Sequence, residues 1–133
     1  MLLVVTNLHV WFVDPFTVLQ SLSWLCLAGS IYVAMAGMQL LHQRQSTEAG
    51  EPDALIETGL YSMIRHPLYS ALLLLGLSAF FKLPGLFPGI LLFGAVFTLV
   101  STVKAEEELD EKKFGPKYED YRMRTKMFIP YFF

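Results

Sequence analysis

Two polar segments of the chain hold the side chains that could do chemistry. The first segment, residues 53–69, places Arg65, His66 and Tyr69 around Pro67. Proline suits the first turn of a helix, and the free N–H groups of a helix start favour a negative group beside them. An imidazole at this place could take the proton from an amine or thiol acceptor. The alternative is interfacial anchoring, because membrane boundaries collect arginine, histidine and tyrosine.

The second segment, residues 104–121, contains three consecutive glutamates, Glu106, Glu107 and Glu108. Carboxylates are unfavourable at a helix C-terminal end near a membrane, since the helix dipole and the lipid surface both prefer cations there. Two interpretations follow. Either the helix continues into water with the glutamates as a solvated face, or one carboxylate turns inward toward a cationic ligand.

The residues after the glutamates predict a helix break and a further short helix. Phe114 is followed by Gly115 and Pro116, which end the preceding helix. Tyr118 and Tyr121 are three residues apart and can share one face of the next helix. The chain then closes with aromatic residues suited to a membrane interface.

The elements that must position these segments are long runs without charge. Arg44 follows 29 uncharged positions, Arg65 and Lys82 flank 16, and Lys82 and Lys104 flank 21. About 20 apolar residues cross a bilayer. We therefore predict an all-α integral membrane protein with about three full transmembrane helices, a short N-terminal apolar segment and a cytosolic C-terminal helical tail. A compact soluble bundle is the alternative, but these runs leave a short chain little polar surface.

The predicted spans differ in length. They are, in order, residues 16–41, 68–81 and 86–103. The middle run is short alone, at roughly 21 Å for a rise of about 1.5 Å per residue. It can span if the helix begins near His66 and continues through Lys82, whose side chain would then snorkel outward. Residues 82–85 predict a hairpin turn, whereas residues 1–13 are too short to cross and predict a half-helix packed at the membrane face.

Composition sets the class of protein. The 133 residues fit one domain, residues 1–133, and are 54% hydrophobic but only 17% charged. A soluble domain carries about 25% charged residues, so this balance excludes a disordered chain and argues against an ordinary soluble enzyme. The net charge of −2 predicts no nucleic-acid partner. The single cysteine, Cys26, is expected to be buried, and because no histidine has metal-ligand spacing with it we predict no metal.

The distribution of basic residues predicts the orientation. Residues 44–65 and 104–133 hold nine of the ten basic residues, and only Lys82 lies elsewhere. One helical hairpin separates these two segments, so they lie on the same side of the bilayer. The positive-inside rule places both in the cytosol. We therefore expect an integral membrane protein whose polar site faces the cytosol, with a ligand that arrives from water or sideways from the bilayer.

Taken together, the two segments resemble a known family. The pattern is a Gly-x-Tyr, an Arg-His-Pro-x-Tyr turn, a glutamate pair after the next hairpin, Phe-Gly, paired tyrosines and a late Ile-Pro. Its members are Gly59, Tyr61, Arg65, His66, Pro67, Tyr69, Glu106, Glu107, Phe114, Gly115, Tyr118, Tyr121, Ile129 and Pro130. Over roughly residues 45–130 this order and spacing are similar to the isoprenylcysteine carboxyl methyltransferase family, which is integral to the membrane and includes related phospholipid and small-thiol methyltransferases.

The resemblance implies an enzyme that uses S-adenosyl-L-methionine at the cytosolic membrane face. The acceptor would be lipid-linked or apolar, either an isoprenylcysteine-type carboxylate or a phospholipid amine or small thiol, so the implied partners are the bilayer and such an acceptor. By the same resemblance, the cofactor-binding residues are Leu55, Ile56, Tyr61, His66, Pro67, Leu68, Tyr69, Glu106 and Glu107. His66 and Glu107 are the candidate catalytic residues.

The family pattern leaves two registers for the glutamates. Counting back seven residues from Phe114 selects Glu107. A leucine that the family usually has three residues after the pair is missing here, so a shift by one residue, which selects Glu108, is also considered. In the carboxyl methyltransferases an arginine four residues before the glutamate contacts the substrate. That position is Val103, or Lys104 in the shifted register, which makes Lys104 the candidate for substrate binding.

Two other functions remain open. A nicotinamide-dependent membrane reductase of the sterol-reductase type shares a similar His-Pro-x-Tyr turn and needs no glycine-rich dinucleotide fingerprint. The glutamate pair followed by Phe-Gly and paired tyrosines favours the methyltransferase. The second alternative is a non-enzymatic membrane module that binds lipid or a partner helix. Such a module would need no ordered arrangement of His66 and Glu107.

Overall fold

The computed structural model describes residue 5, residues 17–47, residue 55 and residues 57–129. In chain order its helices are α2 (Val18–Thr47), the 3-10 helix η2 (Gly59–Ser62), α3 (Pro67–Lys82), α4 (Leu86–Phe114) and α5 (Pro116–Arg124). The described residues contain no β-strand, only an isolated bridge between Ile64 and Lys126. The predicted all-α class is therefore confirmed. The half-helix predicted for residues 1–13 lies outside the described residues, Val5 apart.

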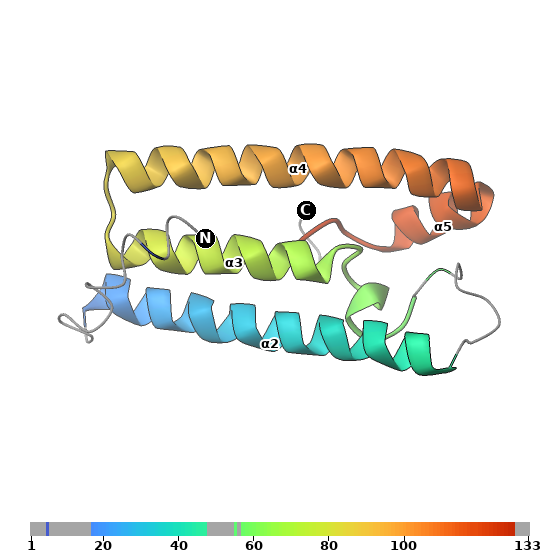
Figure 1. The fold of residues 1–133 in the computed structure, drawn as a ribbon, viewed down its shortest axis with the longest axis horizontal. Coiled ribbons are helices and arrows are strands. Elements are labelled where there is room, and N and C mark those ends of the chain that lie inside the picture. Colours follow the sequence, from blue (N-terminus) through green and yellow to red (C-terminus); the bar gives the residue numbers. More distant parts are fainter. Residues whose placement is uncertain (1–4, 6–16, 48–54, 56, 130–133) are drawn as a thin grey trace.

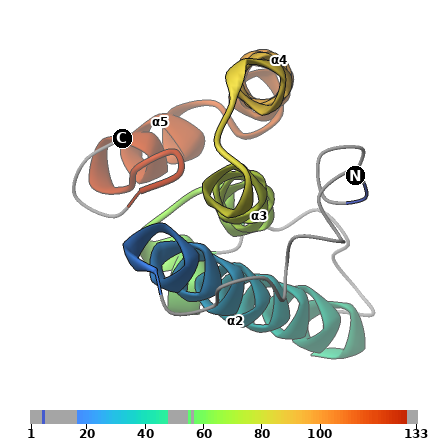
Figure 2. The same cartoon turned by 90° about the vertical axis from the view of Figure 1, so that its left-hand side faces the viewer.

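Three long helices lie side by side, with α3 between α2 and α4 (Figure 1). The view turned by 90° shows the same order and places α5 to one side of α3 (Figure 2). Because α3 and α4 form an antiparallel hairpin, the start of α3, the charged end of α4 and the whole of α5 gather at one end of the molecule. Both polar segments found in the sequence thus meet at that end.

Helices α2 and α3 pack through small residues. On α2, Ser23, Ser30 and Gly37 recur at intervals of seven residues. The Ser23 hydroxyl donates to the Ser78 carbonyl at 2.7 Å, and the Ser30 hydroxyl donates to the Ala71 carbonyl at 2.8 Å. Small residues and interhelical hydrogen bonds hold helices together in lipid, where burying apolar surface gives no advantage over lipid contact. This packing fixes α3 against α2.

Two helices, α2 and α4, are long and apolar enough to cross a membrane. Large apolar side chains on their outer faces are exposed, including Leu25 and Tyr32 on α2 and Phe93 and Phe97 on α4. Helix α3 has 16 residues and is about 24 Å long, which is shorter than the roughly 30 Å hydrocarbon core. Two of the three predicted spans are confirmed in length and composition, and the third stays a prediction.

The turn between α3 and α4 occurs where the sequence predicts it, because α3 ends at Lys82 and α4 begins at Leu86. The prediction that Lys82 extends outward is wrong. Its surface is only 1% exposed, and its Nζ lies 4.3 Å from the centre of the Trp24 ring. A cation–π contact of this kind holds the ammonium group against α2. The expectation for Cys26 also needs correction, since it is partly exposed rather than buried.

The break between α4 and α5 lies at Gly115, as predicted. Its φ of 57° is a left-handed value that glycine adopts without a side-chain clash. Pro116 then starts α5, where its missing N–H costs nothing. Tyr118 and Tyr121 are both buried, and their ring centroids are 6.1 Å apart. The prediction that the two tyrosines share one face of the helix is confirmed. This buried face of α5 packs against the rest of the fold.

Candidate active site

The loop before α3 pairs with the segment that follows α5. The Arg65 N–H donates to the Lys126 carbonyl at 2.7 Å, and the His66 N–H donates to the Met127 carbonyl at 3.2 Å. In return, the Lys126 N–H donates to the Met63 carbonyl at 3.0 Å. These backbone bonds satisfy groups that would otherwise be left unpaired near the start of α3. They also fix the position of His66 relative to the tail.

Two buried hydroxyls reinforce this junction. Ser70 donates to the Phe128 carbonyl at 2.7 Å, and Tyr121 donates to the Tyr61 carbonyl at 2.6 Å. Burial raises the pKa of the Tyr121 phenol, so this group stays neutral and remains a donor. The two polar segments therefore form one structural unit with α5.

Glu107 is the glutamate that turns inward. Only 6% of its surface is exposed, and its Oε1 accepts a hydrogen bond from Arg65 Nε at 2.7 Å. Arg65 Nη1 also donates to the carbonyls of Thr125, at 2.6 Å, and Arg122, at 3.1 Å. One guanidinium thus joins the start of α3, the charged end of α4 and the end of α5. Both partners of the ion pair are 8% exposed at the side chain, so each neutralises a charge that would be costly to bury alone.

His66, the residue immediately before α3, lies between two carboxylates. Its Nε2 is 3.4 Å from Glu107 Oε1, and its Nδ1 is 3.8 Å from Glu106 Oε2. Tyr69 donates its hydroxyl to Glu106 Oε1 at 2.5 Å. The imidazole is 11% exposed, and its Nε2 has no hydrogen bond of regular geometry with any described residue. The two carboxylates lie on the two nitrogen edges of the ring and fix the orientation of the imidazole.

The three consecutive glutamates face three different environments, as expected for helix positions about 100° apart. Glu107 is buried, whereas Glu108 is exposed to solvent. The side chain of Glu106 is 43% exposed, so its carboxylate lies at the rim of the cluster. The structure therefore adopts the register that turns Glu107 inward, and it does not adopt the register shifted to Glu108.

The other residues assigned to the start of α3 are not all near this cluster. Pro67 is buried in the first turn of α3, as predicted. Leu68 packs against α2, since a Cβ built on Gly37 would lie 3.2 Å from its side chain. Tyr61 is half-buried in η2, and its carbonyl accepts a hydrogen bond from the Tyr121 hydroxyl. Leu68 thus packs helices together, and Tyr61 holds the loop to α5.

The remaining predicted site residues are Leu55, Ile56 and Lys104. Leu55 is partly buried, and Ile56 lies outside the described residues. Lys104 is exposed on α4, and among the described residues no hydrogen bond or ion pair joins it to the site. The structure therefore does not bring Lys104 to the carboxylates.

Sequence reasoning noted Arg65 and Tyr118 but gave neither a role in the site. Tyr118 is 2% exposed, and its hydroxyl has no hydrogen-bond partner among the described residues. Its pKa is raised by burial and then by the charges of Glu107 and Asp110, so the phenol stays protonated. A buried donor without a partner calls for an explanation, and here it lies where a ligand with acceptor groups could use it.

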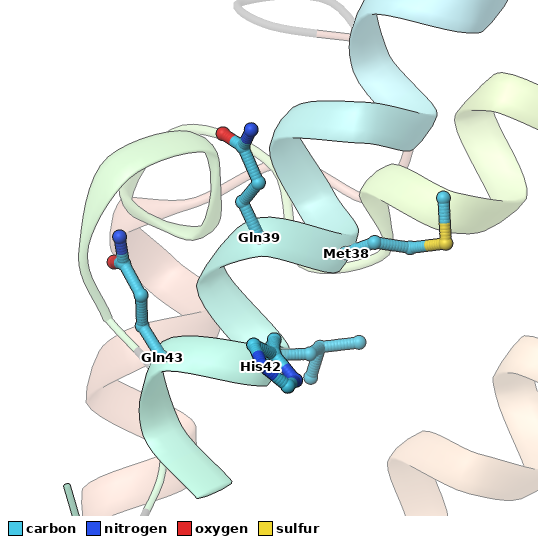
Figure 3. A pocket seen from close by; sticks show the side chains of 5 residues that line it. Met38, Gln39, His42 and Gln43 are labelled. Atoms are coloured by element: carbon cyan, nitrogen blue, oxygen red, sulfur yellow. The ribbon is translucent and has the colours of Figure 1, made fainter. Parts of the chain in front are cut away.

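A separate hollow of about 720 Å³ lies near the C-terminal end of α2 (Figure 3). It is lined by Met38, Gln39, Leu41, His42 and Gln43. All five residues belong to one helix, and His42 is exposed. Within the described parts of the chain, no group of three or more histidine, cysteine, aspartate or glutamate side chains could hold a metal ion. The cluster around His66 therefore carries the strongest chemical signal.

Comparison with known proteins identifies the family. The family described as a protein of unknown function, DUF1295, matches residues 2–125. The chain belongs to this family. Homologues of this chain are named as methyltransferases of the isoprenylcysteine carboxyl methyltransferase-like membrane family, so the resemblance seen in the motifs is confirmed.

Two curated relatives of this DUF1295 chain have names that describe an activity. The chain is 30% identical over 138 residues to methanethiol S-methyltransferase of Pseudomonas deceptionensis, an alignment that covers 93% of this chain and 50% of the relative. It is 37% identical over 76 residues to methanethiol S-methyltransferase 2 of Bradyrhizobium diazoefficiens, covering 56% of this chain and 28% of the relative. The chain thus spans half the length of the first relative and less than a third of the length of the second. No solved structure gives a significant match.

Proposed function

We propose that this chain carries the site of an S-adenosyl-L-methionine-dependent membrane methyltransferase whose acceptor is a small thiol. The observation that supports the proposal most strongly is the buried cluster of Arg65, His66 and Glu107, with Glu106 at its rim. The cluster joins both polar segments at the charged end of α4. The distribution of basic residues supports a cytosolic position for that end.

The residues present fit the chemical groups of S-adenosyl-L-methionine. That molecule carries a sulfonium cation and an amino-acid end with both charges. The partly exposed carboxylate of Glu106 and the ring of Tyr69 would hold a cation. The buried Tyr118 hydroxyl, which has no hydrogen bond to a described residue, would complete the polar contacts. By family resemblance, Leu55 belongs to the loop that would cradle the adenine end, and Tyr61 would contribute an aromatic ring to the wall of the cofactor site.

The acid–base chemistry falls to His66. S-adenosyl-L-methionine supplies a methyl group on a sulfonium centre, and a thiol acceptor must lose its proton to become a good nucleophile. His66 Nε2 faces Glu107, so a proton on this nitrogen orients the ring. Nδ1 is then the nitrogen that accepts the thiol proton. Glu106, 3.8 Å from Nδ1, stabilises the resulting cation and opens a path to water.

The same geometry supports a thiol over a carboxylate as the acceptor. A substrate carboxylate would need a basic side chain near the reacting end. Val103 occupies the family's arginine position and is fully buried, while Lys104 is exposed and away from the cluster. The Arg65 guanidinium, which is buried, is already used by Glu107 and the tail. The names of both relatives point in the same direction, since each describes methyl transfer to methanethiol.

Ligand-induced stabilisation tests the cofactor. We expect S-adenosyl-L-methionine and S-adenosylhomocysteine to raise the melting temperature of the detergent-solubilised protein. A ligand at 100 times its Kd adds about 2.7 kcal/mol to the free energy of unfolding. NADPH at the same concentration is the control for a reductase. A shift with NADPH and none with either sulfur nucleoside would contradict the proposal.

Charge removal at each glutamate tests the site. We expect Glu107→Gln to weaken S-adenosylhomocysteine and S-adenosyl-L-methionine binding most, because it leaves the Arg65 guanidinium unneutralised beside a cationic ligand. The loss of a charge-assisted contact costs about 1.5–3 kcal/mol, or roughly 10- to 150-fold in Kd. Glu106→Gln should have a smaller effect, and the exposed Glu108→Gln should change the Kd little. Isothermal titration of the three variants decides the order, and a dominant effect of Glu108→Gln would contradict it.

A further inference from the structure

A second feature lies beside the charged cluster. It is a cavity of about 130 Å³ between α3, α4 and the segment after α5. Every residue that lines it is apolar; these residues are Leu73, Val96, Leu99, Val100, Phe128 and Ile129. The cavity is open at Ile129, which is 48% exposed, and its apolar lining favours an apolar guest.

The cavity continues the faces of α3 and α4 that carry the cluster. On α3, Leu73 follows Tyr69 by four residues and therefore lies one turn further along the same face. On α4, Val96, Val100 and Glu107 lie along one stripe, with the fully buried Val103 between the last two. Val100, the lining residue of α4 nearest to the cluster, precedes Glu107 by seven residues, so the cavity begins about two turns from that carboxylate, toward the apolar parts of both helices.

The wall formed by Phe128 is held in place by the same junction that positions His66. Phe128 is 6% exposed, and its carbonyl accepts the hydrogen bond from the buried Ser70 hydroxyl. The preceding residue, Met127, accepts the His66 N–H. The cavity and the imidazole therefore have a fixed spatial relation that does not depend on a bound ligand.

The volume limits what the cavity can hold. An engineered apolar cavity of about 150 Å³ takes up one benzene molecule, which has six heavy atoms. A cavity of 130 Å³ is therefore large enough for a sulfur atom with a few carbons. It is far too small for an isoprenyl chain or the acyl chains of a phospholipid.

We propose that this cavity is the acceptor chamber of the proposed methyltransferase: it takes the alkyl group of a short-chain thiol of up to about six heavy atoms and directs the sulfur toward His66. The inference rests on the proposed function for its chemistry and adds the substrate size. Each methylene that fits should raise kcat/KM by about fourfold, as burial of one CH₂ predicts. For thiols too long to fit in the chamber, further methylenes should no longer raise kcat/KM.

Two neighbouring leucines on α3 provide the matched test. Leu73 lines the cavity, whereas Leu72 is 52% exposed on the outer face. Leu73→Trp fills the chamber, so it should reduce kcat/KM for butanethiol about tenfold or more and move the optimum toward methanethiol. Leu72→Trp should keep the wild-type chain-length profile. S-adenosylhomocysteine binding should remain within about twofold of wild type in both variants, because no cavity residue belongs to the cluster.

A second pair of variants guards against misfolding of the bulky substitution. Leu73→Ala enlarges the chamber and should shift the optimum toward longer thiols such as hexanethiol, while Leu72→Ala should not. Unchanged profiles in both Leu73 variants would overturn the proposal and leave the cavity as a packing void.

Photolabelling separates this inference from the proposed function. A butyl diazirine should label the peptides that contain Val100 and Phe128 in the wild type and in Leu72→Trp, but not in Leu73→Trp. This readout needs neither cofactor nor turnover. If labelling follows this pattern and no thiol is methylated, the chamber stands and the proposed function fails. If thiols are methylated but these peptides are not labelled, the chamber assignment is wrong and the proposed function stands.

Discussion

Replacing Arg65 with methionine is expected to lower the free energy of unfolding by about 3–5 kcal/mol, the cost of breaking a buried ion pair. The substitution leaves the buried Glu107 carboxylate without its strongest partner. It also removes the hydrogen bonds that the guanidinium donates to the carbonyls of Thr125 and Arg122. The measurement is thermal or denaturant unfolding in detergent, compared with wild type at the same pH.

Two variants decide why Arg65 matters. In the double variant Arg65→Met/Glu107→Leu, both charges are gone, so stability should recover in part although cofactor binding stays lost. Arg124→Met is the matched control, because Arg124 pairs with Glu57 and Asp120 on an exposed surface. Exposed ion pairs contribute little, and this control should unfold like wild type. Equal effects of Arg65→Met and Arg124→Met would refute a special role for the buried pair.

The helices were largely predictable because their determinants are local. Charge-free runs locate α2 and α4, Pro67 starts α3, and Gly115 ends α4. In each case the deciding property belongs to the residue itself, such as the missing N–H of proline or the left-handed φ of glycine. The turn from Lys82 to Leu86 is likewise determined locally, by the proline and glycine that it contains. Local chemistry thus accounts for the order of the elements and for most of their ends.

The positions of Lys82 and Arg65 could not be read from the sequence, because both depend on partners far along the chain. A lysine at the end of an apolar run is expected to extend toward water, but Trp24 on α2 offers a ring that holds the ammonium group inside. The partners of Arg65 come from α4 and from the segment after α5. No local pattern indicates that the tail would pair with the loop before α3.

The choice among the three glutamates also depends partly on contacts that are distant in the sequence. Helix geometry predicts that only one of three consecutive positions can face inward squarely, but it does not say which one. The spacing to Phe114 favoured Glu107 by family resemblance, and the structure buries Glu107 against Arg65. The role of Glu106 arises only in three dimensions, because its partners His66 and Tyr69 lie on another element.

Replacing His66 with glutamine is expected to reduce the rate of thiol methylation by about 10²–10⁴-fold near pH 7, the usual contribution of a general base. Glutamine keeps a polar side chain of similar reach but cannot accept a proton at the position of Nδ1. S-adenosylhomocysteine binding should fall far less than the rate, because the carboxylates, Arg65 and Tyr69 remain. Initial rates with methanethiol, together with ligand titration, measure the two effects separately.

The pH dependence of this variant distinguishes a base from a structural role. Without His66 the reaction depends on thiolate already present in water, and below the thiol pKa that fraction rises about tenfold per pH unit, with a reference value near 8.5 for cysteine. The deficit of His66→Gln relative to wild type should therefore shrink as pH rises from 7 to 9. His42→Gln is the matched control, since His42 is exposed on α2 and its replacement should leave the rate unchanged at every pH. A deficit that stays constant with pH would show that His66 positions the cluster rather than moving the proton, because lost alignment cannot be restored by ionising the acceptor.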